Sequence, residues 1–275
     1  MKLERGMVAL VTGASRGIGV HLAEALARKG VDVGLAARTE GALEGVARRV
    51  EAHGVRALPV ATDVTKLAQL RRLVTRTNKE LGPIDVLINN AGIELVAHFA
   101  SIDPDVISST IATNLTAAEL LTRLVVPQMI DRRRGHILNM ASLSAKSAYP
   151  YSTVYASTKH ALVGFSWSLR EELRPYGIGV SAICPSHVAD VGVFAERHPD
   201  NRSHTLVRPV EPEKVAAATI QAIERNKAEV VIAKGLGKIV DVFQAISPDL
   251  ATLIPRKTGF YDFLARDASK TTPPP

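Results

Sequence analysis

The chain has 275 residues, of which 46% are hydrophobic, 22% charged and 4% aromatic, and its formal net charge is +7. This composition excludes a disordered, collagen-like or coiled-coil protein, and a chain of this length can bury a core that needs no disulfide or metal. Its one cysteine, Cys184, excludes an internal disulfide and a cysteine-rich zinc site, so we expect no metal. No apolar run reaches the roughly 18 residues that span a bilayer, and the polar start does not resemble a secretory signal. We expect a soluble, cytoplasmic protein.

The positive charge is dispersed along the chain. Basic doublets and the triplet at 132–134 mostly precede glycines or predicted strands, near the ends of helices where cations complement the helix dipole. Aromatic residues are not interleaved with them, and no predicted helix carries a continuous basic stripe. We therefore expect no nucleic-acid partner.

Short, β-branched runs alternate with longer segments of helical periodicity. The runs predict buried strands over residues 7–12, 31–37, 55–60, 84–89, 135–141, 178–184 and 229–233. A helix is expected to start near Glu211, with Pro212 in its first turn. This alternation predicts right-handed βαβ units, and hence an α/β fold: a Rossmann-type doubly wound, mainly parallel seven-stranded sheet flanked by helices, in a single domain over residues 1–235.

Two further segments differ from this pattern. Residues 186–210 are polar and follow the sixth strand, at the edge where open α/β sheets bind ligands, so they form either a lid over the substrate or an ordinary surface loop. Residues 236–268 form an amphipathic extension that we expect to pack on the domain or on a partner subunit, with a break or kink at Pro248. The alternative is an apolar entry helix that touches a membrane surface. Residues 269–275 are predicted to be a disordered tail.

A glycine-rich turn joins the first strand to the first helix. Its residues Gly13, Ser15, Arg16, Gly17, Ile18 and Gly19 follow a G-x-x-x-G-x-G spacing. Glycines allow the backbone to approach a pyrophosphate closely, and the following helix offers free N–H groups and a positive dipole. The position of the turn in a strand–helix unit therefore predicts a dinucleotide site.

The end of the second predicted strand indicates which dinucleotide binds. An acidic side chain there would accept a hydrogen bond from the ribose 2′-hydroxyl and favour NAD(H). The sequence instead has Ala37-Arg38, and Arg38 together with Arg16 can bind a 2′-phosphate through their guanidinium forks. We predict NADP(H) in preference to NAD(H).

Several polar residues form a pattern that points to catalysis. Tyr155 and Lys159 lie one helical turn apart and therefore on one face, and Ser142 ends a predicted strand. Asn114 lies within a long helical stretch, and residues 89–92 read Asn-Asn-Ala-Gly at the end of the fourth strand. With the glycine turn and Asp63-Val64 after the third strand, these motifs occur in the order and spacing typical of one family. Over residues 5–235 the chain resembles the NAD(P)-dependent short-chain dehydrogenases/reductases.

The resemblance implies a role for each residue. Asn114, Ser142, Tyr155 and Lys159 would form a catalytic tetrad, and Asp63 would contact the adenine ring. The cofactor-binding residues would further include Val64, Asn90, Ala91, Gly92, Tyr155, Lys159, Pro185 and Val188. The resemblance also implies a homodimer or homotetramer built through helices at about 104–130 and 152–176.

The expected chemistry is hydride transfer between a nicotinamide and a carbonyl carbon. The pKa of a phenol, about 10, must fall for it to act as a base at neutral pH, and the Lys159 ammonium would lower it. Tyr155 would then be the general acid in reduction and the base in oxidation, while Ser142 donates a hydrogen bond to the developing alkoxide. Lys159 would also hold the nicotinamide ribose, and Asn114 would position a water in a proton relay.

We therefore expect an NADP(H)-dependent oxidoreductase that interconverts a carbonyl and a secondary alcohol on a moderately hydrophobic small molecule. Two alternatives remain open. One is a dinucleotide-binding regulator without turnover, and the other is a peripheral membrane protein that uses the C-terminal helix.

The sequence departs from the family after the sixth strand, where Pro-Gly-x-Val-x-Thr is usual and residues 185–190 read Pro-Ser-His-Val-Ala-Asp. Ser186 replaces the glycine of the turn, and Asp190 places a carboxylate where a hydroxyl would meet the nicotinamide carboxamide. We interpret His187 as an ordinary loop histidine rather than part of the site. Glu94 and His98 are placed near the expected substrate cleft, each as a candidate substrate contact.

Overall fold

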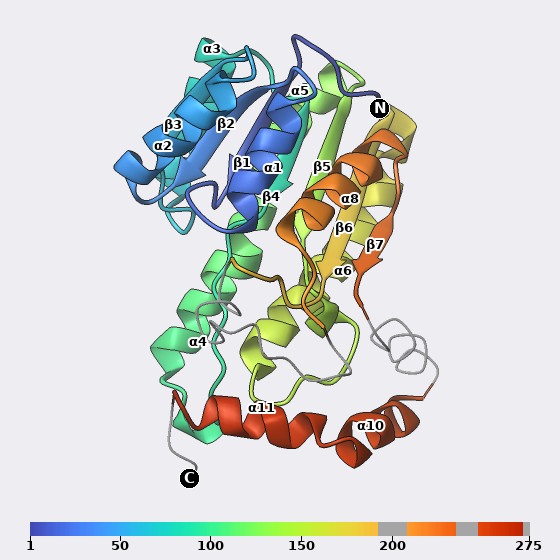
Figure 1. Ribbon diagram of the computed structural model, residues 1–275. Helices are drawn as coiled ribbons and strands as arrows, with labels where there is room; N and C mark the ends of the chain where they lie inside the picture. The colour runs from blue at the N-terminus through green and yellow to red at the C-terminus, as the bar shows by residue number, and fades with distance from the viewer. Residues whose placement is uncertain (192–207, 235–246, 272–275) are drawn as a thin grey trace.

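The computed structural model describes residues 1–191, 208–234 and 247–271. Seven parallel strands form one sheet in the order β3-β2-β1-β4-β5-β6-β7 (Figure 1). Their bounds are β1 Val8–Thr12, β2 Asp32–Ala37, β3 Ala57–Ala61, β4 Val86–Asn89, β5 Gly135–Met140, β6 Ile178–Pro185 and β7 Glu229–Ile232. The predicted doubly wound sheet is confirmed, and each predicted strand is present with its ends shifted by no more than two residues.

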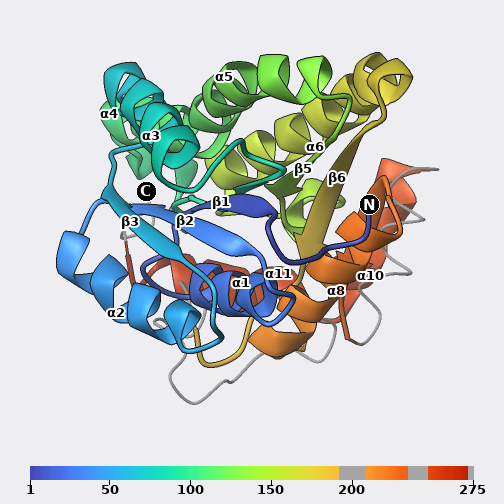
Figure 2. The same ribbon diagram turned by 90° about the horizontal axis from the view of Figure 1, so that it is seen from above.

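Helices cover both faces of this sheet (Figure 2). One face carries α1 (Ile18–Ala27), α2 (Glu40–Glu51) and α8 (Pro212–Glu224), and the other carries α3 (Leu67–Glu80), α5 (Ala117–Asp131) and α6 (Thr153–Leu173). Because both faces are covered, the strands are apolar throughout, and most of their residues are buried. The strand order reverses between β1 and β4, and α/β sheets bind ligands at such a switch point, outside the carboxyl ends of the strands.

The predicted long helix over about 104–130 consists of three consecutive segments. Helix α4 (Pro104–Ile111) is followed by a π-helical segment, Ala112–Thr116, and then by α5. At the start of α4, the Asp103 carboxylate accepts a hydrogen bond from the Asp105 backbone N–H. Shorter 3₁₀ turns span Phe99–Ser101, Leu143–Ala145 and Arg174–Tyr176.

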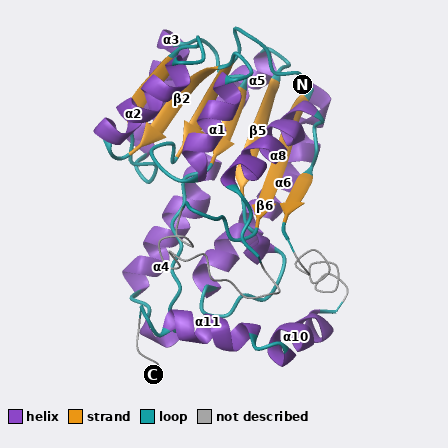
Figure 3. Cartoon of the chain, viewed as in Figure 1, coloured by secondary structure: helices purple, strands orange, loops and turns teal. Residues whose placement is uncertain are grey.

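Two C-terminal helices lie beyond the carboxyl ends of the strands (Figures 1 and 3). They are α10 (Pro248–Lys257) and α11 (Phe260–Ala268), and α11 buries Phe260 and Leu264 against Leu143. Helix α10 begins at Pro248, where proline is compatible with the first helical turn. Residues 236–246 of the predicted amphipathic stripe, most of the predicted lid and residues 272–275 of the predicted tail lie outside the described residues. Within the described parts, no helix has the length and apolar character needed to cross a membrane.

Candidate active site

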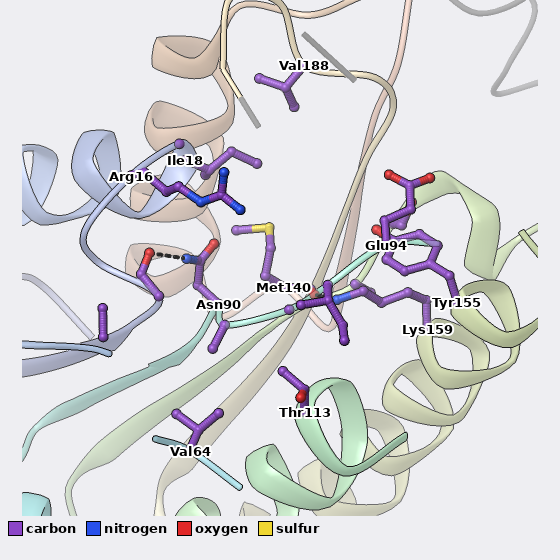
Figure 4. Close-up of a pocket in the computed structure, with 18 of the residues that line it drawn as sticks. Arg16, Ile18, Val64, Asn90, Glu94, Thr113, Met140, Tyr155, Lys159 and Val188 are labelled. Carbon is purple, nitrogen blue, oxygen red and sulfur yellow. Dashed lines mark hydrogen bonds between the residues drawn. The ribbon is translucent and has the colours of Figure 1, made fainter. Parts of the chain in front are cut away.

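A cavity of about 770 Å³ opens at the carboxyl ends of the strands (Figure 4). Most of the residues selected from the sequence line it, namely Gly13, Ser15, Arg16, Gly17, Ile18, Arg38, Asp63, Val64, Asn90, Ala91, Gly92, Ser142, Tyr155, Lys159, Pro185 and Val188. Gly19 and Asn114 are not among the residues that line the cavity. Residues that are distant in sequence thus meet in one site because their strands end at one edge of the sheet.

The glycine turn is too tightly packed for larger residues. Gly13 and Gly17 have φ of 64° and 61°, in the left-handed region that favours glycine. A Cβ on Gly13 would lie 2.9 Å from the Ala91 Cα, and one on Gly19 would overlap the Gly13 carbonyl oxygen. Gly19 therefore serves the packing of α1 against the turn. No side chain caps α1 at Gly17, so N–H groups at the start of this helix can bind an anion.

Thr12 and Asn90 fasten this turn to the loop after β4. The Thr12 hydroxyl oxygen accepts hydrogen bonds from the backbone N–H groups of Asn90 at 3.0 Å and Ala91 at 3.1 Å. The Asn90 side-chain nitrogen donates in return to the carbonyl oxygens of Thr12 and Gly13, at 3.0 and 3.2 Å. Asn90 thus fixes the shape of the turn as well as bordering the cavity.

One end of the cavity is rich in charge. Arg16 and Arg38 line it and are exposed, and no acidic side chain ends β2. Across this end, the Asp63 carboxylate accepts hydrogen bonds from the Thr65 hydroxyl at 2.7 Å and the Thr65 N–H at 2.9 Å. These bonds lower the pKa of Asp63. We call this region, with the glycine turn, the glycine-turn end.

The opposite region, which we call the reaction end, holds Ser142, Tyr155 and Lys159. The Lys159 ammonium donates a hydrogen bond to the Met140 carbonyl at 2.7 Å. Burial lowers the pKa of Lys159 to about 8, and the charge of Glu94 opposes this change. Burial also raises the pKa of Tyr155, as does Glu94, while a hydrogen bond with Ser142 lowers it. The Tyr155 phenol is therefore kept protonated in this structure.

Ser142 is held by the turn that follows β5. Its hydroxyl oxygen accepts a hydrogen bond from the Ser144 N–H at 3.2 Å, at the start of the 3₁₀ turn Leu143–Ala145. It also forms the hydrogen bond with Tyr155. Ser142 and Tyr155 are thus arranged so that both hydroxyl groups can meet one substrate oxygen.

Asn114 lies behind the cavity wall. Its side chain accepts a hydrogen bond from the Ile93 N–H and donates one to the Ile93 carbonyl, both at 2.8 Å. It also donates to the Thr158 hydroxyl at 3.2 Å, and that hydroxyl donates to the Tyr155 carbonyl. The π-helical segment thus places Asn114 where it joins the loop after β4 to the first turns of α6.

The reaction end also contains Glu94, Tyr149 and His187. All three line the cavity, and the Tyr149 hydroxyl lies 2.8 Å from the His187 Nε2. Our interpretation of His187 as an ordinary loop residue was therefore wrong: the turn after β6 directs it into the site. Tyr149 was missed, and its only signal was its place in the loop between Ser142 and Tyr155.

Two other expectations about this region, for His98 and Asp190, need correction. His98 does not line the cavity; its ring packs edge-on against Tyr151, and its Nε2 lies 3.4 Å from the Ser269 hydroxyl. Asp190 is not among the residues that line it either; it is exposed and has a φ of 60°. Ser186 fits its turn without a positive φ, and its N–H donates to the Ile232 carbonyl at 2.8 Å.

No group of three or more His, Cys, Asp or Glu side chains in the described parts of the chain is arranged to hold a metal ion.

Comparison with known proteins gives one family. A family model described as short chain dehydrogenase matches residues 7–202. The ketoacyl reductase HetN of Nostoc sp. (strain PCC 7120) is 36% identical over 263 residues, which cover 94% of this chain and 91% of that protein. A dehydrogenase/reductase SDR family protein 7-like of Drosophila melanogaster is 31% identical over 256 residues, covering 89% and 78%.

Solved structures have the same fold. A variant of actinorhodin polyketide ketoreductase, solved with NADPH, has a TM-score of 0.78 and 31% identity, and the match covers 84% of this chain and 97% of that one. A metagenomic short-chain oxidoreductase in complex with NADP has a TM-score of 0.71 and 32% identity, covering 83% and 97%.

Proposed function

Because the chain belongs to the short-chain dehydrogenase/reductase family, a family of oxidoreductases, we propose that it is an NADP(H)-dependent enzyme that interconverts a carbonyl and a secondary alcohol. One observation carries the proposal. Ser142, Tyr155 and Lys159 meet at the carboxyl edge of the sheet, in the same cavity as the glycine turn. Binding and proton transfer can therefore occur in one continuous site.

The residues present fit a phosphorylated dinucleotide. The turn at Gly13 has no room for a Cβ, and the uncapped start of α1 offers N–H groups to a pyrophosphate. Arg16 and Arg38 would hold a 2′-phosphate, and β2 ends without the carboxylate that favours NAD(H). The two solved relatives described above, with NADPH and NADP, support the same cofactor.

NADPH, when bound, would supply the hydride. The protein must then deliver a proton to the carbonyl oxygen, and Tyr155, whose phenol is protonated, would donate it. Ser142 would donate a hydrogen bond to the same oxygen. Once Tyr155 has given up its proton, the Lys159 ammonium would stabilise the resulting phenolate. Asn114 would keep Tyr155 in place through Thr158.

The finer parts of the proposal concern substrate and assembly. We infer a moderately hydrophobic substrate, because apolar side chains of Leu143, Val188 and Val191 line part of the cavity. We also infer a homodimer or homotetramer formed through α4, α5 and α6. This is supported by the exposed Val106 and Ile111 of α4 and the exposed Trp167 of α6.

The test follows NADPH consumption by near-ultraviolet absorbance with a panel of ketones and aldehydes. Tyr155→Phe should lower turnover by about 10²–10⁴-fold, because it removes the proton donor, and should retain NADPH binding. Tyr176→Phe, at an exposed residue of the 3₁₀ turn after α6, is the matched control and should keep its turnover. Near-normal turnover in Tyr155→Phe would contradict the proposal. Binding without consumption across a broad panel would favour a regulator.

A further inference from the structure

Two neighbours in the chain hold Asp63 at the glycine-turn end of the cavity. The carboxylate oxygen Oδ1 of Asp63 accepts hydrogen bonds from the Thr65 hydroxyl at 2.7 Å and from the Thr65 backbone N–H at 2.9 Å. The backbone N–H of Asp63 donates to the Gln69 side-chain oxygen at 2.7 Å. Because Gln69 lies in the first turn of α3, this bond ties the loop after β3 to that helix. The backbone and the carboxylate of Asp63 are therefore both fixed.

The bonds from Thr65 leave the other carboxylate oxygen of Asp63 able to accept. Both bonds go to Oδ1, whereas a carboxylate offers about four acceptor positions on its two oxygens. Asp63 is partly buried and lines the cavity together with Val64 and Thr65. The same bonds lower its pKa, so the group is ionised at neutral pH. Through Oδ2, Asp63 can thus accept a charge-assisted hydrogen bond from a ligand.

The chemistry of the dinucleotide identifies the donor of this bond. In the proposed function Arg38 holds the 2′-phosphate, and Arg38 and Asp63 line the same end of the cavity. The base is joined to the adjacent carbon of that ribose, so it must lie at this end as well. A carboxylate only accepts hydrogen bonds, and the amino group is the one N–H donor of an adenine attached to ribose. The amino group is therefore the part of the base that Asp63 can bind.

We propose that Thr65 and Gln69 are positioning residues, which direct the second carboxylate oxygen of Asp63 to the amino group of the adenine. This inference rests on the proposed function. Thr65 restricts the rotation of the carboxylate, and Gln69 restricts the backbone from which that side chain extends. Without either bond, Asp63 gains conformational freedom that it must lose again when the dinucleotide binds. The two residues therefore make the site selective for a base with an amino group.

The test compares NADPH with an analogue whose base is purine, in which a hydrogen replaces the amino group. The wild-type protein should bind NADPH about tenfold more tightly, because the analogue lacks the donor to a charged acceptor. Thr65→Val removes the hydroxyl and keeps the shape, so this preference should fall to about threefold. Gln69→Met should change it in the same direction, whereas Thr65→Ser keeps the hydroxyl and should keep the preference. Fluorescence titration measures the dissociation constants, and general effects of a variant cancel in their ratio.

Thr75→Val is the matched control, because it makes the same change at an exposed position of α3 and should leave the ratio unchanged. Asp63→Ala should abolish the preference, and a preference that persists in it would overturn the inference. Equal binding of the two nucleotides by the wild-type protein would overturn it too. So would a lower melting temperature of Thr65→Val with an unchanged ratio, since Thr65 would then only stabilise the start of α3. Failure to bind either nucleotide would instead overturn the proposed function.

Discussion

The Lys159 ammonium lies 5.5 Å from the centre of the Tyr155 ring, one turn away on α6, and its hydrogen bond to the Met140 carbonyl holds it there. A backbone carbonyl carries no full charge, so it offsets little of the free energy needed to bury the ammonium. This is why burial lowers the pKa of Lys159 to about 8 from its usual 10.5. The protonation of Lys159, which the proposed proton transfer uses, therefore also affects the free energy of unfolding.

The first prediction concerns stability against pH. Between pH 8 and 10.5 the unfolded chain holds a proton on Lys159 that the folded chain has lost, so this group makes stability rise with pH in that window. Relative to Lys159→Met, the wild-type protein should gain about 2 kcal/mol of unfolding free energy from pH 7 to pH 9.5. Urea denaturation at both pH values measures this. A difference that is constant with pH would contradict the lowered pKa.

The second prediction concerns the choice of dinucleotide. Arg38→Ala should raise the dissociation constant of NADPH by about 10- to 100-fold, because it removes a charge-assisted contact with the 2′-phosphate. The constant for NADH should change by less than about twofold, because NADH has no 2′-phosphate. Fluorescence titration with both nucleotides measures the two constants. Arg71→Ala, an exposed arginine on α3, is the control. An equal increase in the dissociation constants of NADPH and NADH would show that Arg38 does not bind the 2′-phosphate.

The fold was predictable because parallel strands that are covered on both faces are short apolar runs, which can be recognised in the sequence. The β4 residues Val86–Asn89 are buried along their whole length, so the run is apolar and short. The π-helical segment at Ala112–Thr116 left no comparable trace, since its residues fit a normal α-helix equally well. The sequence predicts a break or kink at Pro248, and a helix, α10, begins at this proline.

The site was predictable only where one local segment carries the chemistry. The spacing of Tyr155 and Lys159 on one helix is such a case, as is the glycine turn. Tyr149 and His187 lie 38 residues apart, and no local pattern indicates that they share a hydrogen bond. Their meeting depends on the strand order, which brings the loops after β5 and β6 together. Asn114 was selected by its motif alone, and the structure places it behind the cavity wall, linked to Tyr155 through Thr158, so its role in a relay stays a prediction.

The third prediction concerns Asn114. Asn114→Ala leaves the partly buried N–H and carbonyl of Ile93 without the Asn114 side chain as partner, so unfolding free energy should fall by about 1–3 kcal/mol. The kcat should also fall while the dissociation constant of NADPH changes little, because the link through Thr158 to the Tyr155 carbonyl is lost. Asn78→Ala, exposed on α3, is the control for both measurements. A loss of stability with unchanged kcat would mean that Asn114 acts only in folding.

The last prediction concerns the C-terminal helix α11. Phe260 packs edge-on against Tyr149 with ring centres 5.6 Å apart, and Tyr149 bonds His187 at the reaction end. Phe260→Ala should therefore raise KM for the carbonyl substrate severalfold, because the wall of the cavity loses its support. The dissociation constant of NADPH should stay within about twofold of wild type, because the glycine-turn end is built from other elements.

The measurement is steady-state kinetics together with NADPH titration, both made well below the unfolding transition, because truncating a buried phenylalanine also lowers stability by about 3–5 kcal/mol. Leu250→Ala, at an exposed residue of α10, is the control and should change neither constant. Equal weakening of NADPH and substrate in Phe260→Ala would indicate general loosening of the domain. A rise in KM without a change in the dissociation constant of NADPH would establish that α11 supports the substrate wall. Loss of contacts at the reaction end affects substrate binding and leaves NADPH binding unchanged.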